Sequence, residues 1–121
     1  METNIDEALL ISARVDVNSQ VPITSQILRI AVYDEFKAYE TYTKIIEKFG
    51  LVQPFVNIKE AEAVHYAALI KLMEKYGVEV PLNNWASKIE IPNTLIECCE
   101  MGVAGEIDNI AMYNNLLGFA V

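Results

Sequence analysis

Hydrophobic residues recur at intervals of three and four along three segments of the chain, at residues 24–49, 55–76 and 93–117. This spacing keeps side chains on one face of an α-helix and predicts three long helices. The three stripes are Leu28, Ala31, Glu35, Ala38, Tyr42, Ile45 and Phe49; Phe55, Ile58, Glu62, His65, Leu69, Leu72 and Tyr76; and Leu95, Cys99, Gly102, Glu106, Asn109, Tyr113 and Leu116. We therefore expect an all-α bundle.

Turn residues mark the ends of the predicted helices. Pro22, Gly50 and Gly77 bound the first two segments, and the link at residues 51–54 is short enough for an antiparallel hairpin. Residues 78–92 are rich in proline and asparagine and predict a crossover loop. Asn93-Thr94 followed by Glu97 predicts a capping box for the third helix. Two glycines inside that helix, Gly102 and Gly105, favour either close approach of another helix or a break into two shorter helices. Residues 1–20 form an N-terminal arm that is a short helix, a segment gripping a neighbour, or disordered.

Each predicted stripe contains an acid where an apolar residue is expected. The acids are Glu35, Glu62 and Glu106, and Glu62 is followed three residues later by His65, the single histidine of the chain. An ionised carboxylate inside a core is costly unless it is paired, hydrogen-bonded or bound to a cation. Inward-facing Glu-x-x-His pairs hold metal ions in helical bundles. The alternative is a solvated pair with no ligand, since a single Glu-x-x-His motif arises often by chance.

The first and third segments also repeat one another. Tyr42 follows Glu35 by seven residues, and Tyr113 follows Glu106 by the same distance. Seven residues are two helical turns, so each tyrosine lies along the same face as its acid. A phenol in that place either donates a hydrogen bond that supports a metal site, or is a plain core residue.

Three motifs in combination carry a resemblance to a known family. They are Glu35-x-x-Ala38-x-x-x-Tyr42, Phe55-x-x-Ile58-x-x-x-Glu62-x-x-His65 and Glu106-x-x-Asn109-x-x-x-Tyr113. Over residues 24–117 the chain resembles the ferritin-like, rubrerythrin-type di-iron carboxylate proteins, especially small branches without a rubredoxin domain. The resemblance implies iron or manganese as the metal, held by Glu35, Glu62, His65 and Glu106, with Tyr42, Asn109 and Tyr113 in supporting positions.

The chain also departs from that family. The family site takes a Glu from each of two helices and a Glu-x-x-His from each of the other two, whereas this chain has one histidine and four residues after Leu117. The site is therefore reduced to one metal or none, completed by a second copy, or part of a longer natural polypeptide. A two-fold homodimer would supply Glu35, Glu62 and His65 twice, although Glu106 would then be surplus.

Composition and net charge restrict the number of domains, the partners and the location that we expect for the protein. The 121 residues are expected to make one domain, residues 1–121. Of these residues 53% are hydrophobic, which is more apolar surface than three helices can bury among themselves and therefore favours self-association. The net charge of −8, without a basic patch, argues against nucleic acid. We find no apolar run long enough for a membrane helix and no signal peptide, and expect a cytoplasmic protein.

The cysteines and the single histidine exclude several site types. Cys98 and Cys99 are adjacent, so they indicate neither a disulfide scaffold nor a rubredoxin iron site. Cys99 belongs to the predicted inner stripe, and we expect it either to be a small buried hydrophobic residue or to face the metal cavity. No nucleophile and orienting acid accompany His65 at the spacing of a catalytic triad, and no glycine-rich phosphate-binding loop is present. A single histidine also excludes zinc sites that take several imidazoles from one chain.

Two classes of function remain. The first is a metal protein that uses iron or manganese, with an unknown redox partner, for oxidation, peroxide handling or storage. The second is a metal-free helical interaction module descended from such a protein. Three inward acids are hard to keep in a dry core, which favours the first.

Overall fold

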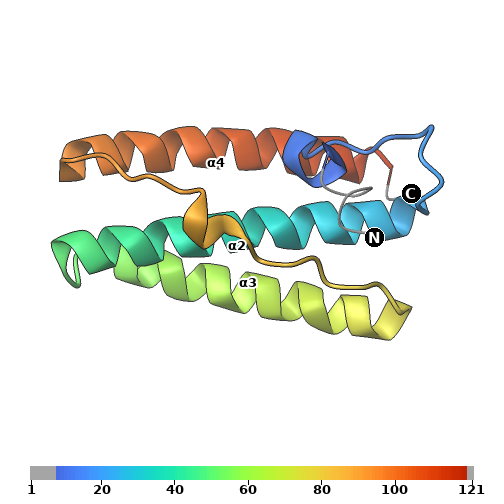
Figure 1. Ribbon diagram of the computed structural model, residues 1–121, viewed down its shortest axis with the longest axis horizontal. Helices are drawn as coiled ribbons and strands as arrows, with labels where there is room; N and C mark the ends of the chain where they lie inside the picture. Colours follow the sequence, from blue (N-terminus) through green and yellow to red (C-terminus); the bar gives the residue numbers. More distant parts are fainter. Residues whose placement is uncertain (1–7, 120–121) are drawn as a thin grey trace.

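The computed structural model describes residues 8–119, which form helices joined by loops (Figure 1). The long helices are α2 (Ile23–Phe49), α3 (Phe55–Tyr76) and α4 (Leu95–Leu117). A short 3₁₀ helix, η1 (Trp85–Ser87), interrupts the loop before α4, and residues 8–12 make a further helical turn. The described residues contain no strand, so the all-α prediction is confirmed.

The helix ends follow from local sequence. Gly50 ends α2 at φ 90° and Gly77 ends α3 in the left-handed region at φ 66°, a conformation that costs glycine little. Thr94 caps α4 by accepting a hydrogen bond from the backbone N–H of Glu97. The hydroxyl of Thr94 in turn donates to the Glu97 side chain at 2.8 Å, so these two residues fix the start of α4 as predicted.

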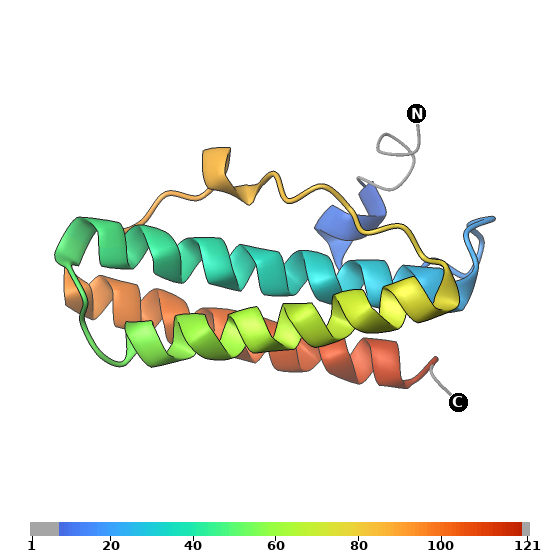
Figure 2. The ribbon, with the colours of Figure 1, turned by 90° about the horizontal axis from the view of Figure 1, so that it is seen from below.

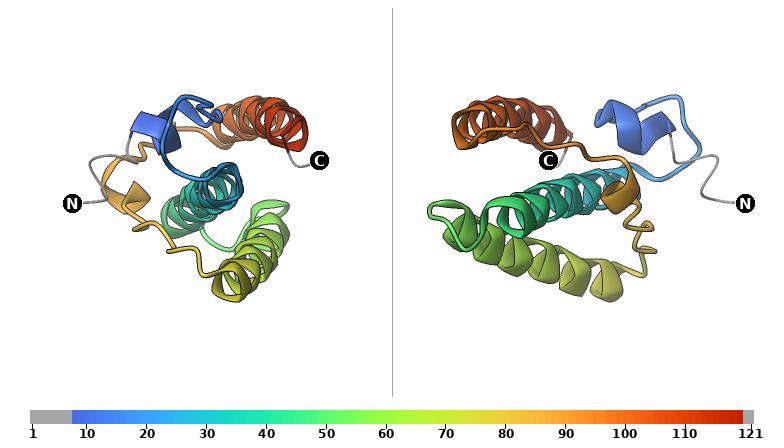
Figure 3. Two further views of the ribbon diagram at one scale, coloured as in Figure 1. Left: turned by 90° about the vertical axis from the view of Figure 1, so that its right-hand side faces the viewer. Right: turned by 60° about the vertical axis from the view of Figure 1, so that its left-hand side comes forward.

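Helix α2 lies at the centre of the arrangement and contacts both other long helices (Figure 3). The short link at residues 50–54 makes α2 and α3 an antiparallel hairpin, and α4 also runs antiparallel to α2 (Figure 1). In the part of the chain described, no Cα atom of α3 lies within 8 Å of one in α4. The side of the molecule between α3 and α4 is therefore open to a further element.

Residues 78–94, here called the crossover segment, run back along α2 from the end of α3 to the start of α4 (Figure 2). The indole N–H of Trp85 donates to the carbonyl of Tyr33 at 2.9 Å. Farther along α2, Lys44 Nζ donates to the carbonyl of Ile89 at 2.9 Å. These bonds make the predicted loop a fixed strap along one helix.

The described part of the N-terminal arm packs where the first half of α2 lies beside the second half of α4. Leu9 joins a hydrophobic cluster with Ile30 and Met112, and the backbone N–H of Asp16 donates to Gln26 at 2.8 Å. Residues 8–19 therefore contact this chain itself, while residues 1–7 lie outside the described residues.

The predicted stripe of α2 is confirmed: its residues are buried or half-buried throughout. The prediction for the buried stripe of α3 is wrong in the second half of the helix. Met73 is fully buried, whereas Leu72 and Tyr76 are 43% and 59% exposed. The buried face therefore lies to one side of the predicted one.

The stripe of α4 is displaced in the same way. Cys98 is fully buried and Cys99 is exposed, the reverse of the prediction, and Leu95 is also exposed. A second apolar stripe, exposed along α4, explains the error; its members are Ile96, Val103, Ile107, Ile110 and Leu117. Because α4 is apolar on two faces, periodicity places the predicted stripe between them.

None of the helices within residues 8–119 combines the length and apolar character needed to cross a bilayer.

Candidate metal centre

Glu35 on α2 and the Glu62-x-x-His65 pair on α3 converge in the middle of the antiparallel hairpin. One ligand atom from each of the three residues lies within 4.8 Å of the others. His65 Nδ1 is 3.6 Å from Glu35 Oε2 and 3.7 Å from Glu62 Oε2. Three of the four residues predicted as ligands are thus brought together by two helices.

The environments of these three side chains differ. Glu35 and Glu62 are 4% and 8% exposed, whereas the His65 side chain is 55% exposed. Glu35 Oε2 is buried and makes no hydrogen bond. Buried carboxylate oxygens normally have a partner, so this atom is the feature most in need of a ligand.

The other oxygen of Glu35 accepts a hydrogen bond from a tyrosine of a different helix. The hydroxyl of Tyr113 on α4 donates to Glu35 Oε1 at 2.9 Å. Tyr42 on α2 in turn lies near the acids of the other two helices, because Glu106 and Glu62 both contribute to its raised pKa. Tyr113 therefore supports an acid on another helix, which the repeat within each helix did not predict, whereas Tyr42 makes no hydrogen bond to an acid among the described residues.

Protonation is shifted strongly at this centre. The pKa of Glu62 is raised from 4.5 to about 9, first because burial removes solvation from the carboxylate, and then because the carboxylate of Glu35 lies beside it. Burial and the charge of Glu106 and Glu62 raise the pKa of Tyr42 to about 12. Burial and the charge of Glu35 raise the pKa of Tyr113. The neutral forms of these groups are favoured while no cation is present.

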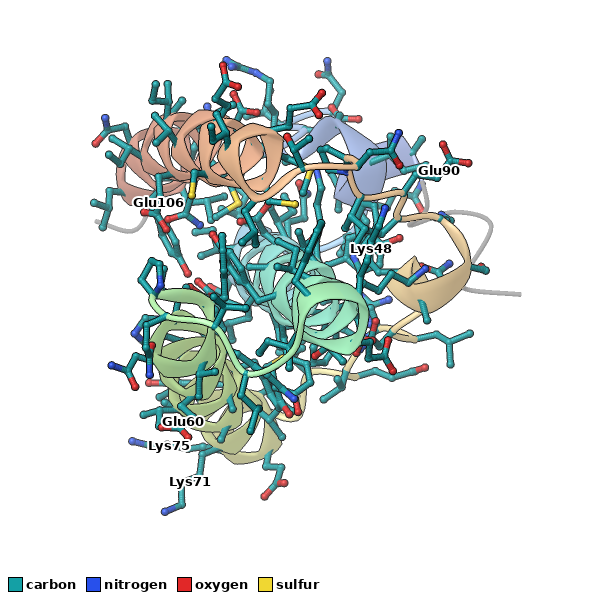
Figure 4. All side chains as sticks on the ribbon, turned by 90° about the vertical axis from the view of Figure 1, so that its left-hand side faces the viewer. Lys48, Glu60, Lys71, Lys75, Glu90 and Glu106 are labelled. Atoms are coloured by element: carbon teal, nitrogen blue, oxygen red, sulfur yellow. The ribbon has the colours of Figure 1, made fainter. Side chains whose placement is uncertain are left out.

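Glu106 does not join the three-residue group, and the prediction that it is a third buried acid is wrong. Its side chain is exposed, on the side of α4 that faces α3 (Figure 4). The reason is geometric: α4 does not approach α3, so neither helix covers the other on this side. Glu106 still contributes to the raised pKa of Glu62, which places its charge at the edge of the centre.

A further acid at the centre, Asp34, escaped the sequence reasoning. Asn109 Nδ2 donates to Asp34 Oδ2 at 2.8 Å, so the predicted supporting role of Asn109 is directed to Asp34. Burial raises the pKa of Asp34, and the hydrogen bond from Asn109 partly opposes that shift. Its position directly before Glu35 is the one signal in the sequence that could have drawn attention to it.

Two carboxylates and one imidazole form a donor set that suits iron or manganese. The exposed ring of His65 leaves the group open to solvent. Three protein ligands with an open side leave coordination positions free for water, a substrate or further protein ligands.

No family model, curated protein or solved structure matches the chain.

Proposed function

We propose that the protein binds iron or manganese through Glu35, Glu62 and His65, as a ferritin-like carboxylate protein that handles iron or carries out oxidation with dioxygen or peroxide. The observation that carries the proposal is the buried Glu35 Oε2, which has no hydrogen-bond donor and lies 3.6 Å from the imidazole of His65. A cation shared by the two acids would satisfy this oxygen and replace the proton that Glu62 otherwise retains.

A second copy of the chain is the proposed source of further ligands. The open side between α3 and α4 exposes His65 and Glu106 together with the apolar stripe of α4. Exposed apolar surface of this kind is typical of interfaces, and two-fold dimers are the commonest closed assembly. A helix of the partner in this position would cover the stripe and bring a second set of ligands to the centre.

The first experiment measures metal content per chain after purification without chelator and after reconstitution with iron or manganese. Glu62→Gln and His65→Ala are compared with Glu60→Gln, a matched control on α3 whose side chain points away from the other helices (Figure 4). We expect bound metal in the parent and the control, and loss of metal in both site variants. A parent that takes up neither metal would overturn the proposal.

The dimer is tested separately by light scattering. Ile107→Glu charges the exposed stripe of α4, and Leu82→Glu places the same charge on the crossover segment, where Leu82 is 68% exposed. We expect Ile107→Glu to be monomeric and to bind less metal, and Leu82→Glu to match the parent. A parent that is monomeric with and without metal excludes completion by a second copy, whatever its metal content.

The alternative function is a metal-free helical interaction module. The observation that favours it is the raised pKa of Glu62, since a proton retained by Glu62 lets the two buried acids lie together without a cation. In that case the exposed stripe of α4 would be the binding surface. Absence of metal from the parent protein, together with an unchanged fold of Glu62→Gln, would favour this alternative.

A further inference from the structure

A cavity of about 440 Å³ lies between α2, α4 and the crossover segment. Small residues of α4 leave room for it: Gly102, Ala104 and Gly105 all line the cavity. A Cβ atom at Gly105 would meet no atom within 4 Å. Trp85 and Ile89 of the crossover segment also line it, as does Glu62 of α3. The glycines in the middle of α4 thus have a structural consequence, which is an open space beside α2.

The size and lining of the cavity are those of a site for a small organic molecule. Its volume falls within the range of about 300–1,000 Å³ that is usual for ligand pockets. Ala38, Met101 and Ile89 contribute apolar groups beside the polar and charged side chains of the lining. A lone metal ion would not use the apolar part of this surface, whereas a molecule with a short hydrocarbon chain would.

The hydroxyl of the buried residue Tyr42 reaches this space and makes no hydrogen bond to the described residues. Tyr42 is 6% exposed and lines the cavity, and the position of a Cβ at Gly102, another lining residue, is 3.4 Å from its hydroxyl oxygen. The Tyr42 ring packs against the ring of Phe55, with 5.9 Å between the ring centroids, which leaves the hydroxyl end of the side chain directed to the cavity that it lines. A buried hydroxyl normally has a partner, and a polar group of a ligand would supply it.

The charge around the cavity selects the kind of ligand. Five carboxylates and two lysines line it; they are Asp34, Glu62, Glu90, Glu106, Asp108, Lys37 and Lys88. The Nζ atoms of both lysines lie over the ring of Trp85. The distance from Nζ to the ring centroid is 5.3 Å for Lys37 and 5.5 Å for Lys88. Glu62 keeps its proton at neutral pH, so the other four acids exceed the two lysines by two, which favours a cation and disfavours an anion.

We propose that this cavity binds a small organic cation, a primary amine with a short apolar chain, whose ammonium donates to the Tyr42 hydroxyl and whose chain lies between Trp85 and Met101. The carboxylates of Glu106 and Asp108 lie on the α4 side of the same space and supply the compensating negative charge. Glu62 lines this cavity and also belongs to the candidate metal centre, whereas Glu35 and His65 do not line it, so the amine site adjoins the metal centre and is tested without metal.

The test compares three ligands of equal length and different charge in a buffer that contains chelator. Hexylamine, 1-hexanol and hexanoate are titrated into the protein by calorimetry, and the indole N–H signal of Trp85, the single tryptophan, reports the location by nuclear magnetic resonance. We expect hexylamine to bind at least ten-fold more tightly than hexanoate, with 1-hexanol between them, and to shift the Trp85 signal.

Three variants connect that binding to the cavity. Gly105→Leu fills the space and should abolish binding, while Tyr42→Phe and Asp108→Asn keep the shape and should each weaken hexylamine about ten-fold without weakening hexanoate. Glu100→Gln removes an exposed acid of α4 that does not line the cavity and should bind as the parent does. Circular dichroism establishes that each variant is folded. Absence of binding to the parent, a preference for hexanoate, or equal binding by Gly105→Leu would each overturn the proposal.

Discussion

The Tyr113 hydroxyl donates a hydrogen bond to Glu35 across the seam between α4 and α2, at 2.9 Å. This bond joins the C-terminal helix to an acid of the candidate metal centre, although α4 contributes no member of the three-residue group. It satisfies one oxygen of a buried carboxylate and leaves the other for a cation. The bond therefore links the folding of α4 to the chemistry of the α2–α3 hairpin.

Replacement of Tyr113 by phenylalanine leaves Glu35 Oε1 without its donor. We expect this change to lower the free energy of unfolding by about 1–3 kcal/mol, the usual cost of an unsatisfied buried polar group. If a metal binds, its affinity should also fall about 10- to 100-fold, as is typical when a supporting hydrogen bond to a ligand is lost. Urea denaturation and metal titration measure the two effects. Tyr42→Phe is the control, and a decrease in stability as large as that of Tyr113→Phe would contradict the assignment.

The pH dependence of stability provides a prediction for Glu62. Its pKa is about 9 in the folded chain against an ordinary value of 4.5, so folding favours the protonated form. The contribution of this group to stability is complete below pH 4.5 and is lost as the pH rises through about 9. In chelator, the parent should therefore lose stability relative to Glu62→Gln as the pH is raised from 5 to 9, which urea midpoints at several pH values would measure. Parallel curves for the two proteins would contradict a raised pKa.

Met73 and Leu72 distinguish the observed buried face of α3 from the one expected from periodicity. Met73 is fully buried against Leu28, Val32 and Phe36, so Met73→Ala should lower the free energy of unfolding by about 2–5 kcal/mol. Leu72 is 43% exposed, and Leu72→Ala should cost much less. Thermal or chemical denaturation of both variants gives the comparison. A greater loss of stability for Leu72→Ala than for Met73→Ala would favour the buried face predicted from the sequence.

The two glycines inside α4 should respond differently to alanine. Gly105→Ala adds a methyl group in open space and should stabilise the protein by about 1 kcal/mol, the usual difference in helix propensity. At Gly102 the added carbon lies 3.4 Å from the hydroxyl of Tyr42, so the gain should be smaller. Denaturation curves compare the two variants, and a greater gain at Gly102 would show that α4 is closer to α2 at Gly105 than at Gly102.

The sequence predicts the parts of this structure that depend on local chemistry. The ends of the helices at Gly50 and Gly77, the cap at Thr94, and the convergence of Glu35 with Glu62 and His65 all follow from residue types and spacing. Helix α2 has one clearly apolar face, and its stripe is confirmed.

Features that depend on how helices are placed were not predictable from periodicity. Helices α3 and α4 each carry apolar residues on two faces, so spacing alone did not distinguish Met73 from Leu72 or Cys98 from Cys99. The exposure of Glu106 follows from the separation of α3 and α4, and the bond from Tyr113 to Glu35 depends on the antiparallel alignment of α4 with α2. Neither relationship is encoded within a single segment.

The way the crossover segment is attached has a consequence for how this protein can change. Lys44 and Lys48 hold the segment by its carbonyl groups at Ile89 and Pro92, and every amino acid offers such a group. Its route along α2 is therefore fixed without prescribing the side chains at those positions. Ile89 lines the cavity, so its side chain can be replaced, and the cavity wall changed, while its carbonyl still accepts the hydrogen bond from Lys44.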